Sequence, residues 1–290
     1  MKKHPVLAIC FAVALTATVT TGVNVYLHER PSLGKSVVPR TMDSKLLGEP
    51  REMLVHLPES YHRKPGQRYP VVYVLDGSSV DVHTAHSAAL MARIGVMPEV
   101  IVVGLPNTSG ANRQRDYTPP FIRRDIDKSD SPPGAGDRFI AFLRSEVMPW
   151  IEREYRTASF RVLVGHSRGG LLAVYSLIAD PGLFDARIAL SPALWRDDQV
   201  MVSKLRETLL SRADLDSFLY MSMGSQENEK MMAAYRSAVT TLRQHAPRGL
   251  RWSADLTEGA THATNAETSA PVGFRTLYRG WQPDQEQPPD

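Results

Sequence analysis

The 290-residue sequence predicts an α/β fold in which a mostly parallel central sheet carries helices on both faces. Segments with strand character alternate with segments of helical character along most of the chain. The central strands, such as Tyr69–Leu75, are continuous runs of β-branched, aromatic and aliphatic residues, which is typical of strands buried on both faces. No internal repeat and no second domain boundary are visible in the sequence, so we expect one domain over residues 45–281.

The first 27 residues have the composition of an export signal. Lysines 2 and 3 supply positive charge, and an apolar stretch follows over residues 5–19. This order predicts a secretory signal peptide, although an A-x-A cleavage site is missing. If the segment is not cleaved, residues 5–27 are just long enough to anchor the chain in the inner membrane of a bacterium. Both alternatives predict an exported protein, either periplasmic or secreted, or held at the membrane.

The elements of the domain follow from hydrophobic patterning. Residues 28–44 are polar, contain prolines 31 and 39, and are expected to form a linker. Strands are expected at Arg51–Leu57 (an edge strand), Tyr69–Leu75, Val100–Leu105, Phe160–Val164, Arg187–Leu190, Phe218–Met223 and Leu250–Leu256. Helices are expected at Val80–Arg93, Arg138–Tyr155, Gly170–Ile178, Gln199–Ser211, Glu227–His245 and Ser269–Tyr278. Residues 282–290, rich in proline and acidic side chains, are expected to be a disordered tail.

One long segment, Pro106–Gly136, has turn chemistry and little periodicity. It contains the pairs Pro119-Pro120 and Pro132-Pro133. A stretch of this length without regular structure is uncommon in a compact domain unless it serves as a lid or a binding loop. We therefore expect Pro106–Gly136 to lie near a functional site.

The segment Gly165-His166-Ser167-Arg168-Gly169 fits the G-x-S-x-G pattern of a nucleophile elbow. A buried strand precedes it and an apolar helix follows it, which is the context that this motif requires. Ser167 is expected to have a positive φ at a sharp strand-to-helix turn, with its Oγ clear of the sheet edge. Gly165 and Gly169 are expected where the strand and the helix approach closely.

A serine hydroxyl needs a base to act as a nucleophile at neutral pH. In hydrolases with this elbow, the acid and then the histidine follow the serine, each after a later strand. His262 lies in the loop directly after the last expected strand and is the candidate base. His245 lies near the end of a helix, where a favourable interaction with the helix dipole explains it without a function.

The acid is expected after strand Phe218–Met223. Glu227 is closer to the end of this strand and is preferred to Glu229, which would equally well face solvent in the first turn of the next helix. Both carboxylates would also favour a helix N-terminus without any catalytic role. Glu258, on the same loop as His262, is a third and weaker candidate.

An oxyanion hole requires two backbone amides. The amide of Arg168, the residue after the nucleophile, is the first candidate. The second is the amide of Gly77 or Ser78, in the turn after strand Tyr69–Leu75, where a glycine would let the backbone approach the substrate. A plain Asp-Gly turn is the alternative interpretation of that sequence.

Composition excludes several other functions. The formal net charge is only +3 and the basic residues are scattered, so nothing indicates a nucleic-acid-binding surface. Cys10 is the only cysteine and lies in the N-terminal segment, which leaves the domain without an internal disulfide or a catalytic thiol. His83 and His86 are too few for a zinc site, and no Gly-rich phosphate loop or dinucleotide-binding motif follows a strand.

From about Lys45 to Trp281, the chain resembles the putative-esterase family of α/β-hydrolases, which includes siderophore (enterobactin-type) esterases and S-formylglutathione hydrolases. The resemblance is carried by Tyr73–Gly77, Arg113–Pro119, Phe139–Arg144, Gly165–Gly170, Ser191–Trp195 and His262. It implies an α/β-hydrolase fold and hydrolysis of carboxylic esters by Ser167 with His262 as base, without a metal or organic cofactor. Two positions depart from the branch: Arg168 stands where leucine is frequent, and Arg196 follows Trp195 where a second tryptophan is usual. Both departures make the expected pocket more polar.

The residues and the resemblance together predict an exported serine esterase that acts on a small-molecule ester through an acyl-enzyme on Ser167. A siderophore-type ester is the candidate substrate that the resemblance implies. Arg168, Arg113 and Arg115 would suit an acidic or catecholate-bearing substrate, although salt bridges that hold the long loop explain them equally well. Trp195 would line the pocket or belong to the core. An acyltransferase with the same Ser-His pair and a non-catalytic binding protein of the same fold are the alternatives. The sequence gives no oligomeric state.

Overall fold

The computed structural model describes residues 37–78 and 80–282. The expected signal peptide or anchor, residues 28–36 of the expected linker and residues 283–290 of the expected tail lie outside these ranges. The described residues from Val38 to Gln282 belong to one compact unit. Among the described residues, none of the helices has both the length and the apolar character that a membrane span requires.

One eight-stranded sheet lies at the centre of the described residues, with the order β1-β2-β4-β3-β5-β6-β7-β8. The antiparallel edge of the sheet is made by β1 (Val37–Ser44) and β2 (Glu49–His56), and β2 pairs antiparallel with β4. From β4 to β8 every neighbouring pair is parallel. The strands are β3 (Tyr69–Leu75), β4 (Ile101–Leu105), β5 (Thr157–His166), β6 (Ala186–Leu190), β7 (Ser217–Gly224) and β8 (Leu250–Thr257). This is the mixed, mostly parallel sheet of an α/β-hydrolase, as the sequence predicted.

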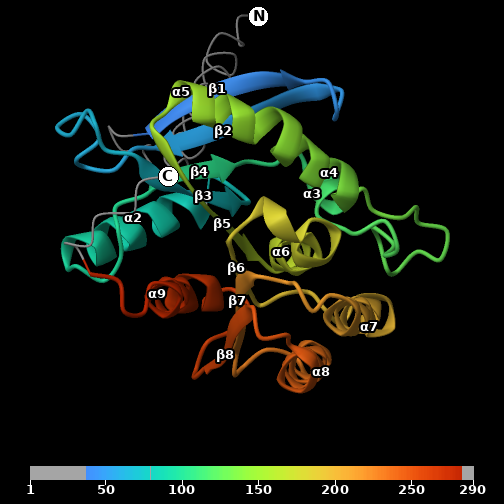
Figure 1. Cartoon of the computed structure of the whole chain (residues 1–290). Coiled ribbons are helices and arrows are strands. Elements are labelled where there is room, and N and C mark those ends of the chain that lie inside the picture. The colour runs from blue at the N-terminus through green and yellow to red at the C-terminus, as the bar shows by residue number, and fades with distance from the viewer. Residues whose placement is uncertain (1–36, 79, 283–290) are drawn as a thin grey trace, which may run out of the picture. The chain divides into compact units, whose positions relative to one another are not determined.

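Two layers of helices cover the sheet (Figure 1). One face packs against α2 (Val80–Arg93) and α9 (Asn265–Leu277). The other packs against α4 (Gly136–Phe142), α5 (Met148–Glu154), α6 (Arg168–Ala179), α7 (Arg196–Ser211) and α8 (Glu229–His245). Along β3, Val72 and Val74 enter the first core, whereas Val71, Tyr73 and Leu75 enter the second. Burial on both faces explains why this strand reads as a continuous apolar run.

Three elements differ from the sequence-based expectation. Residues 37–44, expected to belong to the linker, form the edge strand β1, where Pro39 is tolerated because an edge strand leaves N–H groups unpaired. The segment Pro106–Gly136 contains a short helix, α3 (Gly110–Asp116), capped by Ser109. The single helix expected at Arg138–Tyr155 is divided by a π-helical turn, η1 (Leu143–Val147), just before Pro149, which has no N–H to donate to the preceding turn.

Parallel strands place their carboxyl ends at one edge of the sheet. The turns after β3, β5, β6, β7 and β8 therefore meet there, although up to 186 residues separate Asp76 from His262 in the chain. This edge is where ligands bind in open α/β sheets.

Candidate active site

Ser167 stands at the turn between β5 and α6 with φ 58° and ψ −113°, the strained backbone expected for a nucleophile elbow. The turn is tight because a Cβ at position 165 would lie only 2.3 Å from the carbonyl oxygen of Gly169, so glycine is required there. The Ser167 N–H donates to the Leu190 carbonyl at 2.9 Å, and the Ala193 N–H donates to the Ser167 carbonyl at 3.0 Å. These two bonds tie the elbow to the end of β6.

His262 lies in the loop between β8 and α9, and its Nε2 is 2.9 Å from Ser167 Oγ. The neighbouring His166 supports this loop, because its Nε2 lies 2.9 Å from the His262 carbonyl oxygen. Burial, together with the proximity of His262, lowers the pKa of His166 to about 4. His166 is therefore neutral near pH 7, and its Nε2–H donates to the His262 carbonyl. His262 is therefore positioned both by its carbonyl oxygen, which accepts from His166, and by its ring, which contacts Ser167.

Glu227 lies in the turn between β7 and α8, with its side chain fully buried and its Oε2 2.8 Å from His262 Nδ1. Oε1 accepts the Gly224 N–H at 2.9 Å and the Ser191 hydroxyl. Burial alone would raise the pKa of this carboxyl, but the hydrogen bonds from His262, Ser191 and Gly224 together lower it below its usual range. Glu227 is thus an ionised acceptor aimed at the Nδ1–H of His262.

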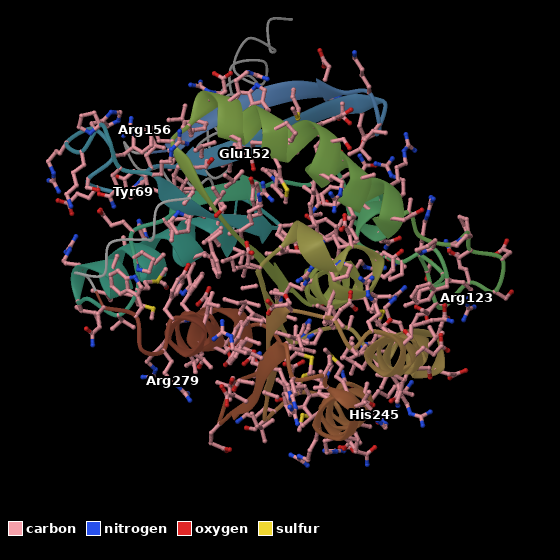
Figure 2. All side chains as sticks on the ribbon, in the orientation of Figure 1. Tyr69, Arg123, Glu152, Arg156, His245 and Arg279 are labelled. Atoms are coloured by element: carbon pink, nitrogen blue, oxygen red, sulfur yellow. The ribbon has the colours of Figure 1, made fainter. Side chains whose placement is uncertain are left out.

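The structure brings Glu227, and not Glu229, to the histidine. The cause is the helix cap: the side chain of Asn228 accepts the Met231 N–H at 3.1 Å, so α8 begins at Glu229. Glu227 is left in the turn before the cap, whereas Glu229 points to solvent and pairs with Arg236. Glu258 is exposed in the turn after β8. His245 lies at the end of α8, outside this cluster (Figure 2).

A buried polar network behind Glu227 was not predicted from the sequence. Ser191, which follows β6, is fully buried with φ 45°, and its Oγ accepts the Asn265 amide at 2.8 Å. The same amide nitrogen donates to Ser222 Oγ at 3.0 Å. Because Asn265 donates to Ser191, the Ser191 hydroxyl must direct its own proton at Glu227. The position of Ser191 at a strand end on the active edge was the signal that could have identified it.

The structure corrects the expectation for the second oxyanion donor. The Gly77 N–H donates to the Leu105 carbonyl at 3.1 Å, and the Ser78 N–H donates to Asp81 Oδ1 at 2.7 Å. Both amides are already used inside the protein. A Cβ on Gly77 would lie 2.5 Å from the backbone nitrogen of Leu105, so the packing against β4 already requires glycine there. The Arg168 N–H, in the first turn of α6, has no acceptor among the described residues.

Arg113 and Arg115, predicted to contact substrate, are both engaged in ion pairs. Arg113 grips Asp76 with two hydrogen bonds of 2.6 and 2.8 Å and so fastens α3 to the turn after β3. Arg115 pairs with Glu49 at 2.6 Å and with Asp116 at 2.7 Å. These contacts match the alternative interpretation, in which the arginines hold the long loop on the domain.

Trp195 is partly buried and lines a cavity of about 530 Å³ between the 106–136 segment, the start of α7 and the start of α8. The cavity also contacts Arg123 and Ile126 on one side and Glu229 and Lys230 on the other. Figure 2 shows Arg123 on the loop between α3 and α4, beside α7. Its guanidinium pairs with Asp197 at 2.7 Å. In the described part of the chain, no group of three or more His, Cys, Asp and Glu side chains could hold a metal ion.

Comparisons with known proteins identify the family of this chain. The family model described as "Putative esterase" matches residues 44–269. The chain is 30% identical over 182 residues to the siderophore enterobactin esterase of Emericella nidulans, covering 56% of this chain and 59% of that protein. It is 32% identical over 143 residues to the ferri-bacillibactin esterase BesA of Bacillus subtilis, covering 45% of this chain and 50% of that protein. The matches thus span 59% and 50% of the length of these two relatives.

Among solved structures, the chain is similar to an IroE-like serine hydrolase from Shewanella oneidensis. The TM-score is 0.75 with 32% sequence identity, over 83% of this chain and 80% of that one. It is also similar to the BES protein from Bacillus cereus, with a TM-score of 0.74 and 26% identity over 83% of this chain and 95% of that one.

Proposed function

Because the chain belongs to the putative-esterase family, a family of ester-hydrolysing enzymes, we propose that it hydrolyses carboxylic esters through an acyl-enzyme on Ser167. The single observation that carries the proposal is the continuous hydrogen-bonded series from Ser167 Oγ through His262 to Glu227. A serine at a strained turn, an imidazole and a buried carboxylate in this order are the components of nucleophilic acyl transfer.

In the proposed first step, Ser167 Oγ attacks the ester carbonyl carbon while His262 Nε2 takes the hydroxyl proton. Glu227 keeps the remaining proton of His262 on Nδ1, so that Nε2 is free to accept, and stabilises the imidazolium that forms. The tetrahedral oxyanion lies against the amide of Arg168 at the start of α6, whose N–H has no acceptor among the described residues and where the helix dipole also favours negative charge. His262 then gives its proton to the leaving alcohol.

Water completes the proposed cycle. His262 Nε2 takes a proton from water, the hydroxide attacks the acyl carbonyl, and the proton returns to Ser167 Oγ as the carboxylic acid departs. All atoms required for these steps come from the ester, from water and from the three side chains. The relatives named as siderophore esterases support a siderophore-type ester as substrate. Export through the N-terminal 27 residues belongs to the proposal as well.

Purified protein treated with a fluorophosphonate probe tests the proposal, because this reagent phosphonylates activated serines. Wild-type protein should react with the probe. Ser167→Ala and His262→Ala should both react more slowly than wild type or not at all. The same variants should lose hydrolysis of 4-nitrophenyl acetate by about 10³-fold or more. Undiminished labelling or hydrolysis by Ser167→Ala would remove Ser167 from the mechanism.

A further inference from the structure

The guanidinium of Arg168, the residue directly after the nucleophile, forms no ion pair with any described residue. Its Nη1 donates to Thr118 Oγ1 at 2.7 Å and to the Arg124 carbonyl oxygen at 3.1 Å. Its Nε and Nη2 have no acceptor among the described residues, and they are not sealed from solvent. One edge of this planar cation is therefore open, on the residue that directly follows Ser167.

A second guanidinium without an ion pair to the described residues lies next to it. Arg196 is 5% exposed, and its Nη2 donates to the carbonyl oxygens of Arg123 and Arg124 at 2.8 and 2.9 Å. Its Nε is buried and lacks any partner among the described residues. The two cations thus share the Arg124 carbonyl oxygen. Burial, followed by the nearby charges of Arg196 and Arg113, lowers the pKa of Arg168 to about 10, so Arg168 is still charged near pH 7.

Other arginines of the domain show what a structural role requires. Arg113 and Arg123 each grip a carboxylate. Arg187 is fully buried without a carboxylate, yet all three of its nitrogens donate, to six hydroxyl and carbonyl acceptors. Arg168 uses only one nitrogen of three. A partly buried cation with unused donors costs free energy that a structural side chain would recover by pairing.

We propose that Arg168 and Arg196 form a subsite for a carboxylate group carried by the ester substrate; this inference rests on the proposed esterase function. The open Nε–Nη2 edge of Arg168 matches the two oxygens of a carboxylate. The carboxylates of Asp125 and Asp76 act on the charge of Arg168, but neither forms an ion pair or a hydrogen bond with it in the described part of the chain. Asp76 binds Arg113 and Asn107, and Asp125 lies 3.6 Å from Lys128 Nζ and accepts the Asp127 N–H. A carboxylate on the ligand would supply the direct partner that Arg168 lacks. A neutral ester of similar size would leave Arg168 unpaired.

Two matched pairs of esters test the subsite. Mono-4-nitrophenyl glutarate and 4-nitrophenyl valerate differ by a carboxylate on the acyl side. 3-Acetoxybenzoate and phenyl acetate differ by a carboxylate on the leaving group. In wild-type protein, kcat/KM for the charged member of one pair should exceed that for its neutral partner, after correction for spontaneous hydrolysis. This preference should fall by about tenfold or more in Arg168→Gln and in Arg196→Gln, since a hydrogen bond to a charged group is lost.

A control variant and an inhibition measurement make the test specific. Arg144→Gln removes an exposed arginine paired with Asp180 and should keep the wild-type preference. Wild-type protein should be inhibited more strongly by 3-carboxyphenylboronic acid than by phenylboronic acid, and Arg168→Gln and Arg196→Gln should lose this difference; no turnover is needed for this measurement. The wild-type preference for the charged compound should also weaken as salt concentration rises. A wild-type preference that persists in both Arg168→Gln and Arg196→Gln, or neutral esters preferred in both pairs, would overturn the subsite while leaving the esterase intact. If wild-type protein hydrolyses no ester above the level of Ser167→Ala, the proposed function itself fails.

Discussion

Replacing Glu227 by glutamine tests whether this carboxylate sets the tautomer of His262. The two carboxylate oxygens accept three hydrogen bonds: Oε1 from Gly224 N–H and Ser191, and Oε2 from His262. A glutamine has one oxygen and one NH₂ group. The oxygen must occupy the Oε1 position, because an NH₂ there would face the Gly224 N–H, which can only donate.

In Glu227→Gln the NH₂ group then faces His262 Nδ1 and forces that nitrogen to accept. The imidazole proton moves to Nε2, which faces Ser167 and can no longer take its proton. The equivalent wrong-tautomer change in serine proteases lowers kcat about 10⁴-fold. We expect a loss of about 10³- to 10⁴-fold here, equivalent to about 4–5.5 kcal/mol of transition-state stabilisation.

Initial rates of 4-nitrophenyl acetate hydrolysis at pH 7.5 (roughly one unit above an unperturbed histidine) measure the effect. Glu229→Gln is the matched control, because Glu229 is exposed and pairs with Arg236 at the surface, and it should stay within about twofold of wild type. Circular dichroism and urea unfolding establish that both variants are folded. If Glu227→Gln keeps activity within a few-fold of wild type, the carboxylate does not orient the base and the reasoning is wrong.

Three other substitutions probe the surroundings of the site. Ser191→Ala removes a hydrogen bond that lowers the pKa of Glu227 and fixes its carboxylate, so activity should fall about tenfold; activity within about twofold of wild type would contradict this. His166 has a lowered pKa, so the unfolded state binds more protons between about pH 4 and 6.5, and folding stability is lost as pH falls through this window. His166→Gln can still donate to the His262 carbonyl, and its urea midpoint should decline less over that range than that of wild type; parallel declines would refute the assignment. Arg187→Met removes the shared donor of six acceptors, of which only the Ser176 and Asp180 carbonyl oxygens keep a backbone N–H in the described part of the chain, and should destabilise by about 3 kcal/mol or more in urea unfolding; a loss below about 1 kcal/mol would show that the network contributes little.

The parts of the fold that sequence predicted well are those set by local pattern. The buried run Tyr69–Leu75 and the helix Val80–Arg93 have the expected bounds, because hydrophobic burial and turn residues delimit them locally. Residues 37–44 were misassigned to a linker, since an edge strand with a proline and mostly exposed side chains has a weak pattern. Its pairing with β2 depends on tertiary context.

The site divides in the same way. The elbow at Ser167 is a local motif, and His262 follows from chain order and the parallel sheet, so both lie where the sequence placed them. The choice between Glu227 and Glu229 depends on a single cap at Asn228, which also has a sequence signature. The partners of the Gly77 and Ser78 amides could not be predicted, because they are fixed by the end of β4 and by Asp81 on α2.

The arginines illustrate the same limit. From the sequence alone, Arg113, Arg115 and Arg168 are equally good candidates to contact an acidic substrate. Only the folded chain shows that Arg113 and Arg115 have carboxylate partners and that Arg168 has none among the described residues. Long-range pairing, which joins segments dozens of residues apart, decides which charges remain for a ligand.

The central claim is that Ser167 carries the acyl group during turnover. Rapid acid quenching of the protein with 4-nitrophenyl acetate, followed by peptide mass spectrometry, measures it directly. We predict the mass of one acetyl group on the peptide containing Ser167 in wild-type protein, and no such peptide in Ser167→Ala. Steady hydrolysis with the acetyl group on another residue, or an equal yield of acetylated peptide from Ser167→Ala, would contradict the account.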